Sequence, residues 1–115
     1  MTGKQNEISW QTALELLQDG NARYVANLTE RPNATVRRRL ETGSGQWPFA
    51  IVLTCADSRV TPELIFDQGI GDIFVVRVAG NVASKEVVGS IQYAVKFINT
   101  ELIVVLGHEL SLIHI

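Results

Sequence analysis

An apolar run that ends in three reactive side chains constrains the fold of this chain more than any other stretch. Residues 49–54 (Phe-Ala-Ile-Val-Leu-Thr) follow Pro48 and are apolar or small. A continuous run of this length predicts a strand covered on both faces, as in a parallel sheet. Cys55, Asp57 and Arg59 come directly after the run. They are therefore expected at the carboxyl end of the strand, where open α/β sheets place their ligand crevices.

Two further strand patterns, separated by helix signals, predict an α/β fold with a parallel sheet. Residues 72–78 and 102–106 are mostly large and apolar or β-branched, with Arg77 inside the first pattern. Thr61 and Ser84 are suitable N-caps for a short helix and a longer one. Alternating strands and helices favour right-handed crossovers, and hence parallel strands with flanking helices. Six residues are expected on the inner face of the longer helix: Val87, Val88, Ile91, Ala94, Val95 and Ile98.

We interpret residues 1–45 as an N-terminal helical arm and a polar connector within a single domain that spans residues 1–115. Ser9 is a suitable N-cap for a first helix, and Asp19-Gly20 is expected to interrupt that helix. A short second helix is expected over residues 35–40. The first helix carries four apolar residues on one face: Trp10, Ala13, Leu14 and Leu17. Two roles stay open for this face, packing on its own domain or docking on a partner subunit.

Composition and charge exclude several classes of protein. The 115-residue chain is 46% hydrophobic with a formal net charge of −2, which is typical of a globular protein and predicts no binding to nucleic acid or membranes. No apolar run approaches the ~20 residues of a membrane-spanning helix, and residues 1–9 lack the apolar centre of a signal peptide. The single cysteine favours a reducing compartment, so a cytoplasmic location is expected. Residues 110–115 show no cap, terminal charge or turn, and we expect the chain to be cut short there.

The residues alone allow three interpretations of Cys55: a buried apolar side chain, a nucleophile or a metal-binding thiolate. A phosphatase-like nucleophile requires a longer anion-binding loop than the three residues between Cys55 and Arg59. A zinc site becomes available if His108, after the third strand pattern, meets Cys55 at one edge of the sheet, with the first strand beside the third. Asp57 and Arg59 are spaced for a charge-assisted pair, which is structural unless other evidence assigns it a role.

Several motifs together resemble those of the beta-class carbonic anhydrases. Thr54-Cys55-Ala56-Asp57-Ser58-Arg59-Val60 is similar to the Cys-x-Asp-x-Arg signature of that family. The resemblance extends over residues 14–109. It includes four further segments: Gly20-Asn21-x-Arg23-Tyr24, residues 67–81, Gly89-Ser90-Ile91-Gln92-Tyr93-Ala94-Val95 in the predicted longer helix, and residues 102–108.

The resemblance implies an activity and roles for individual residues. Family members hydrate carbon dioxide reversibly to bicarbonate by means of a zinc-bound hydroxide, and they form homo-oligomers of two or more subunits. By this resemblance Cys55 and His108 are zinc ligands. Asp57 is either the fourth ligand of a closed site or, paired with Arg59, leaves that position to water, so both residues are assigned to catalysis. Gln68 resembles a residue that helps to hold substrate at a subunit interface.

The resemblance ends just after His108. The family pattern His-x-x-Cys places a second zinc-binding cysteine where this chain has Ser111, and Leu112-Ile113 replace the glycine-alanine run expected next. We therefore expect an incomplete beta-carbonic-anhydrase-like domain in which zinc binding is weakened. We also expect the closed arrangement, with Asp57 on the metal, to dominate in this chain and to leave little hydration activity at neutral pH. Two alternatives stay open. One is a non-catalytic remnant that docks on a full-length subunit, and the other is a zinc hydrolase of a sulfur analogue such as carbonyl sulfide.

Overall fold

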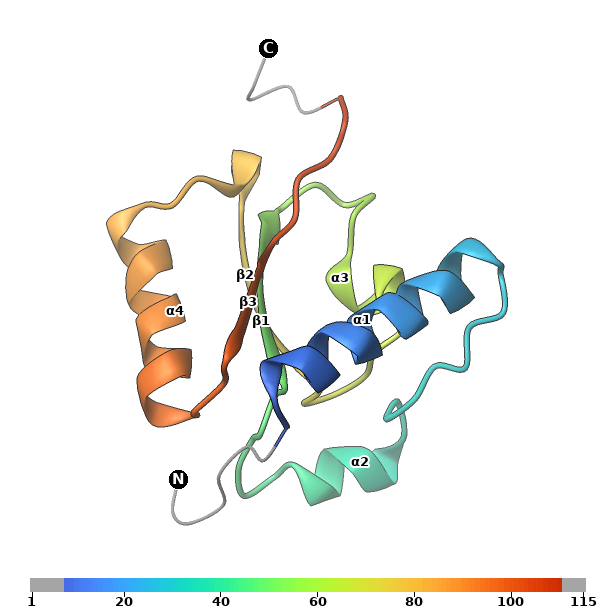
Figure 1. Cartoon of the computed structure of the whole chain (residues 1–115). Coiled ribbons are helices and arrows are strands. Elements are labelled where there is room, and N and C mark those ends of the chain that lie inside the picture. Colours follow the sequence, from blue (N-terminus) through green and yellow to red (C-terminus); the bar gives the residue numbers. More distant parts are fainter. Residues whose placement is uncertain (1–7, 111–115) are drawn as a thin grey trace.

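The computed structural model describes residues 8–110, and its elements follow one another in the predicted order (Figure 1). Side-chain oxygens of Ser9 and Ser84 cap their helices as predicted, and that of Thr35 caps the short second helix. The side chain of Thr61 makes no capping hydrogen bond. The elements are α1 (Trp10–Val25), α2 (Val36–Glu41), β1 (Ala50–Cys55), α3 (Pro62–Ile65), β2 (Ile73–Val78), the 3-10 turn η1 (Ala79–Asn81), α4 (Lys85–Phe97) and β3 (Leu102–Val105).

The three strands form a parallel sheet in the order β2-β1-β3. Ala50 in β1 pairs with Ile73 in β2 and with Leu102 in β3. All six residues of β1 are buried, as predicted for a strand covered on both faces. The predicted placement of the first strand beside the third is confirmed. Because the strands are parallel, the carboxyl ends of β1 and β3 emerge at the same edge of the sheet.

Helices cover both faces of the sheet (Figure 1). On one face, Ala13 and Leu17 of α1 lie in a core cluster with alternate residues of β1. On the other face, Ala94 of α4 and its C-cap residue Ile98 pack against Ile51. The predicted α/β class with a parallel sheet and flanking helices is therefore confirmed. No helix within residues 8–110 is long and apolar enough to cross a membrane.

The buried face of α4 is narrower than predicted. Val88 and Val95 are 40% and 44% exposed, so their placement in the core was wrong. Val95 lines an open hollow between α4 and β3 together with Ile91 and Ile103. Among the described residues, β3 is the last strand on this side of the sheet. The side of α4 that carries Val95 is therefore not covered by any described strand.

α1 runs without a break through Asp19-Gly20, so the predicted interruption was wrong. Gly20 is buried where the helix meets the backbone that follows α3. A Cβ atom at Gly20 would lie 1.7 Å from the carbonyl oxygen of Phe66. The glycine is therefore required for close approach of two backbones rather than for the end of a helix. Ala13 and Leu17 of the apolar face pack on the chain's own sheet, whereas Trp10 is 48% exposed. Docking on a partner subunit stays a prediction.

A buried carboxylate, Asp67, ties α1 and the loop after it to the segment that follows α3. Asp67 is 3% exposed and accepts hydrogen bonds from Nε of Arg23 (2.6 Å) and from the backbone N–H groups of Glu30 (2.9 Å) and Arg31 (3.0 Å). Burial by itself raises the pKa of Asp67, but these donors outweigh burial and hold the pKa below its usual value. The carboxylate therefore stabilises the fold in its ionised form.

Asp67→Asn is expected to lower the free energy of unfolding by about 3 kcal/mol at neutral pH, because it removes the buried partner of the Arg23 guanidinium and leaves only the exposed Glu30 carboxylate beside it. The pKa of Asp67 is lower in the folded state than in the unfolded state, so the carboxylate stabilises the fold above about pH 4, and this contribution is lost as the pH falls through the folded value. Urea unfolding of both proteins at several pH values measures the difference. It should be constant above about pH 5 and shrink below that value. A difference that does not change with pH would contradict this assignment.

Candidate metal centre

The parallel sheet brings Cys55 and His108 to one edge, as predicted. Cys55 is the last residue of β1, and His108 follows β3 by three residues. The N–H of Leu106 donates to the carbonyl oxygen of Leu53 at 2.9 Å, which keeps the chain after β3 beside β1. His108 interacts with the Cys55 thiol, and its Nε2 lies 4.0 Å from Oδ2 of Asp57. Cys55, Asp57 and His108 therefore lie together.

Two backbone N–H groups donate hydrogen bonds to the sulfur of Cys55. The residue is 5% exposed, and its Sγ accepts hydrogen bonds from the N–H groups of Gly80 (3.2 Å) and Asp57 (3.4 Å). Gly80 has a φ of 75°, in the left-handed region that glycine adopts without strain. The His108 ring and then these two N–H groups lower the pKa of Cys55 to about 7. Much of the thiol is therefore ionised at neutral pH, and the thiolate is the form that binds metal ions.

His108 offers one ring nitrogen as a buried acceptor. Its Nδ1 lies 2.7 Å from the carbonyl oxygen of Glu109, and because a carbonyl only accepts, Nδ1 carries the proton and donates. In the neutral ring this leaves the lone pair on Nε2, which is buried and makes no hydrogen bond of ordinary geometry to a described residue. Metal-binding histidines are commonly oriented in this way. Cys55, followed by the carbonyl of Glu109, raises the pKa of His108, so a metal ion would compete with a proton there.

Asp57 is held by Arg59 in a two-point ion pair. Nε of Arg59 lies 2.9 Å from Oδ1, and Nη2 lies 2.6 Å from Oδ2. The backbone N–H of Arg59 also donates to Oδ1 at 2.9 Å. Arg59 therefore holds the pKa of Asp57 well below its usual range, and the carboxylate stays ionised. The structure has Asp57 paired with Arg59, rather than in the closed arrangement that we expected for this chain.

The chemistry of Cys55 and His108 fits zinc, which prefers thiolate sulfur and imidazole nitrogen. The buried Nε2 without a hydrogen bond, next to a thiol of lowered pKa, supports this fit. Within residues 8–110, however, no three His, Cys, Asp or Glu side chains are grouped closely enough to hold a metal ion. The described residues therefore supply two ligands, whereas catalytic zinc usually has three from the protein. Ser111, at the position of the expected second cysteine, lies outside the described residues.

Gln68 occupies a different place from Cys55 and His108. Its Nε2 donates to the carbonyl oxygens of Phe66 (3.1 Å) and Leu16 (3.4 Å). It lines a pocket of about 350 Å³ beside α1 and α3, and neither Cys55 nor His108 lines that pocket. The structure does not bring Gln68 to Cys55 and His108 within one chain. Its role at a subunit interface stays a prediction.

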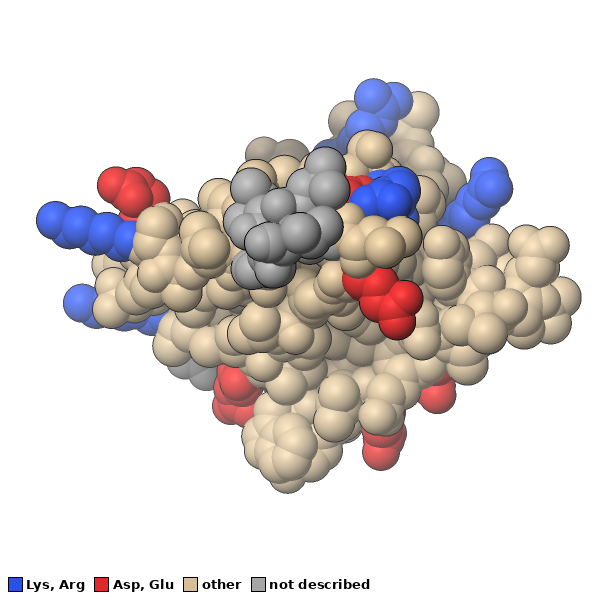
Figure 2. Space-filling model, turned by 90° about the horizontal axis from the view of Figure 1, so that it is seen from above, with Lys and Arg blue, Asp and Glu red and all other residues tan. Residues whose placement is uncertain are grey.

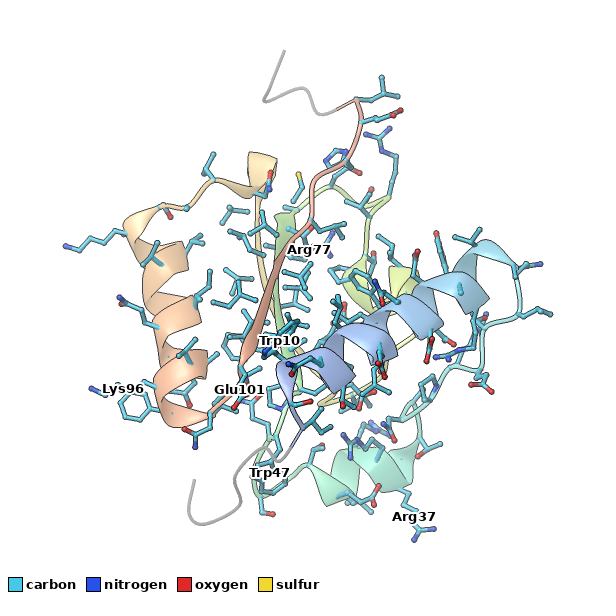
Figure 3. All side chains as sticks on the ribbon, viewed as in Figure 1. Trp10, Arg37, Trp47, Arg77, Lys96 and Glu101 are labelled. Carbon is cyan, nitrogen blue, oxygen red and sulfur yellow. The ribbon has the colours of Figure 1, made fainter. Side chains whose placement is uncertain are left out.

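Arg77 is a candidate that the sequence pattern left without a role. Its Nε donates to the carbonyl oxygen of Cys55 at 2.9 Å, and its Nη2 donates to that of Asp57 at 2.7 Å. Figure 3 shows Arg77 toward the end of the sheet from which the chain runs on to its C-terminus. The available signal was a single charge inside the apolar pattern of residues 72–78, but a strand pattern does not identify the partner of such a charge.

The fold and the site together define a class of protein, a parallel α/β domain with a cysteine, a histidine and an Asp–Arg pair at the carboxyl edge of its sheet. A family model described as carbonic anhydrase matches residues 50–110, which is more than half of the chain and includes Cys55 and His108. The chain belongs to the beta-class carbonic anhydrase family.

Individual relatives give the extent of the similarity. Carbonic anhydrase 2 of Mycobacterium tuberculosis is 52% identical over 97 residues, which cover 84% of this chain and 47% of that protein. The solved structure of the beta-carbonic anhydrase CcaA matches with a TM-score of 0.61 and 30% identity, over 88% of this chain and 48% of that one. A tetrameric beta-carbonic anhydrase of the ascomycete Sordaria macrospora matches with a TM-score of 0.59 and 28% identity, over 88% and 51%. The chain spans about half the length of these relatives.

Proposed function

We propose that this chain carries the zinc-binding edge of a carbonic anhydrase and acts in the reversible hydration of carbon dioxide to bicarbonate. The observation that carries this proposal is the meeting of Cys55, His108 and the Asp57–Arg59 pair at one edge of the sheet. The relative from Mycobacterium tuberculosis, named as a carbonic anhydrase, supports it at 52% identity. Because the chain spans about half of that relative, its own turnover is part of the proposal.

In this proposal each residue of the edge has a separate task. Cys55 and His108 hold the zinc ion. Bound zinc would supply Lewis acidity, which lowers the pKa of a water molecule toward about 7. Arg59 holds both oxygens of the Asp57 carboxylate, which keeps Asp57 ionised and engaged in the ion pair beside the two ligands. Because the pKa of Asp57 is far below neutrality, its carboxylate accepts a hydrogen bond and orients the reacting molecules rather than acting as a general base.

The described surface around this edge carries no large patch of one charge sign. Figure 2 looks down on the end of the molecule where β1 and β3 finish, and charged side chains of both signs lie scattered among uncharged ones. Such a surface favours an uncharged molecule such as carbon dioxide over a polyanion. We also propose a cytoplasmic location, supported by the free Cys55. A homo-oligomer with Gln68 at its interface is proposed as well, supported by the tetrameric relative from Sordaria macrospora.

Arg59→Ala is expected to lower zinc-dependent carbon dioxide hydration about 10- to 100-fold while zinc binding is retained, because the variant releases Asp57 without removing a ligand. Stopped-flow measurements with a pH indicator, alongside metal analysis, test both points on the zinc-loaded chain. Arg37→Ala is the matched control, since Arg37 points away from the protein on α2 (Figure 3) and should not affect the rate. If the wild-type chain shows no zinc-dependent hydration, the proposed activity is wrong. If Arg59→Ala keeps the wild-type rate, the role of Arg59 is wrong.

A further inference from the structure

We infer that Arg77 is a positioning residue for the candidate metal centre at Cys55 and His108. By binding two backbone carbonyls, it holds the loop of residues 55–57 in the conformation that presents both the Cys55 sulfur and the Asp57–Arg59 pair. These two hydrogen bonds go to backbone oxygens and not to the side chain of Cys55 or His108. The inference deepens the proposed function and rests on it for the identity of the ligands.

The register of the sheet places Arg77 directly beside the end of β1. Arg77 pairs with Thr54, and Val78 pairs with Cys55. Paired residues of neighbouring strands project to the same face, and successive residues project to opposite faces. Arg77 therefore leaves the sheet on the face opposite to the Cys55 side chain. Its guanidinium therefore binds the loop from the face opposite to the Cys55 side chain, whereas the N–H of Gly80 donates directly to the Cys55 sulfur.

The two carbonyls that Arg77 binds belong to residues on either side of Ala56. The N–H of Ala56 donates in turn to the carbonyl oxygen of Val78 at 3.1 Å. With three backbone groups of this short loop bound to β2, the peptide between Ala56 and Asp57 has one orientation, in which the N–H of Asp57 points to the Cys55 sulfur. The same conformation places Oδ1 of Asp57 at 2.9 Å from the N–H of Arg59.

The guanidinium is suited to this task in a way that a lysine is not. Arginine presents several N–H groups in a rigid planar fork, so that Nε and Nη2 can bind two separate carbonyls at once. A lysine ammonium would retain the charge near the site but lacks this fixed fork. Comparing Arg77→Lys with Arg77→Met therefore separates the effect of charge from that of bridging.

Arg77→Met is expected to weaken cobalt binding about 10- to 100-fold, which is the usual effect of removing a group that orients a metal ligand. Cobalt titration of the 115-residue chain, followed by the thiolate-to-cobalt absorption band, measures the dissociation constant, and zinc competition gives the value for zinc. In the metal-free protein, amide hydrogen exchange at Asp57 and Arg59 should become about tenfold faster, because the loop opens locally. Arg77→Lys should show a large part of both effects.

Arg38→Met is the matched control. Arg38 also donates from Nε to a backbone carbonyl, that of Ile70 at 2.7 Å, and from Nη2 to Asp72 at 3.3 Å, but at the opposite end of β2. This variant should lose thermal stability and keep both the cobalt affinity and the slow exchange at Asp57. An equal loss in Arg38→Met would mean that Arg77 acts through overall stability, and the inference would be overturned.

The outcomes for the metal site and for Arg77 can be separated. A wild-type chain that gives no thiolate-to-cobalt band would refute the proposed metal site, and the exchange data on metal-free protein would still decide the role of Arg77. If wild type binds cobalt and both Arg77 variants match it in affinity and in loop exchange, the inference is wrong. Should Arg77→Met fail to fold, Arg77→Lys decides between these results.

Discussion

Cys55→Ser is expected to abolish zinc binding. The described residues supply one thiolate and one imidazole for the metal, so the change leaves His108 as a single strong ligand. Removing an orienting group alone costs about 10- to 100-fold in affinity, and removing a ligand should cost more. Competition with a chromophoric chelator measures the dissociation constants of both proteins. The wild-type chain is expected to bind zinc weakly and in substoichiometric amounts after purification.

Asp57→Asn is the control for this experiment. It removes the carboxylate charge but should leave zinc affinity within a few-fold of wild type, because the structure has Asp57 engaged by Arg59. A loss as large as that of Cys55→Ser would show that Asp57 is the third ligand. Full, chelator-resistant zinc in the wild-type chain would show instead that a group outside the Cys55–His108 pair completes the site.

Gly20→Ala is expected to destabilise the fold by about 4 kcal/mol or more, which is exceptional for a single methyl group. In an ordinary helix this change stabilises by up to about 1 kcal/mol, because alanine has the higher helix propensity. At Gly20 the added carbon would lie 1.7 Å from one backbone oxygen, and neither backbone can move without separating α1 from the segment after α3. Denaturant unfolding followed by circular dichroism measures the change.

Gly89→Ala makes the same chemical change inside the other long helix and serves as its matched control. Outside the backbone of its own helix turn, no described atom lies within 4 Å of the position that a Cβ would take at Gly89, and the residue is exposed. We expect this variant to raise the free energy of unfolding by roughly 0.5–1 kcal/mol. A similar loss in both variants would contradict the close-approach explanation for Gly20.

The candidate metal edge is assembled from two strand ends and supported by a third strand. Cys55 comes from β1, and His108 comes from the chain after β3. β2 supplies the support, through the side chain of Arg77 and through the turn that brings the N–H of Gly80 to the sulfur. The central position of β1 in the sheet is therefore what allows both neighbours to act on one loop.

The sequence by itself determined most of the local structure and indicated the candidate ligand pair. Ser9, Thr35 and Ser84 begin helices because their side chains satisfy free backbone N–H groups, an effect confined to a few neighbouring residues. The continuous apolar run of β1 specified a strand buried on both faces for a similarly local reason. Placing Cys55 and His108 at one edge required only the rule that parallel strands end on the same side.

The tertiary structure alone decided the features that depend on distances between elements far apart in the sequence. Whether Gly20 ends a helix or lets two backbones meet depends on Phe66, and the burial of Asp67 depends on Arg23. Which side of α4 is covered depends on where the sheet stops, so Val95 is exposed although its helical periodicity matches the core. Local patterns reflect propensity and hydrophobic periodicity, whereas steric contact and the pairing of buried charges are set by the packed arrangement. For the same reason, the sequence could not identify the two backbone carbonyls that Arg77 binds.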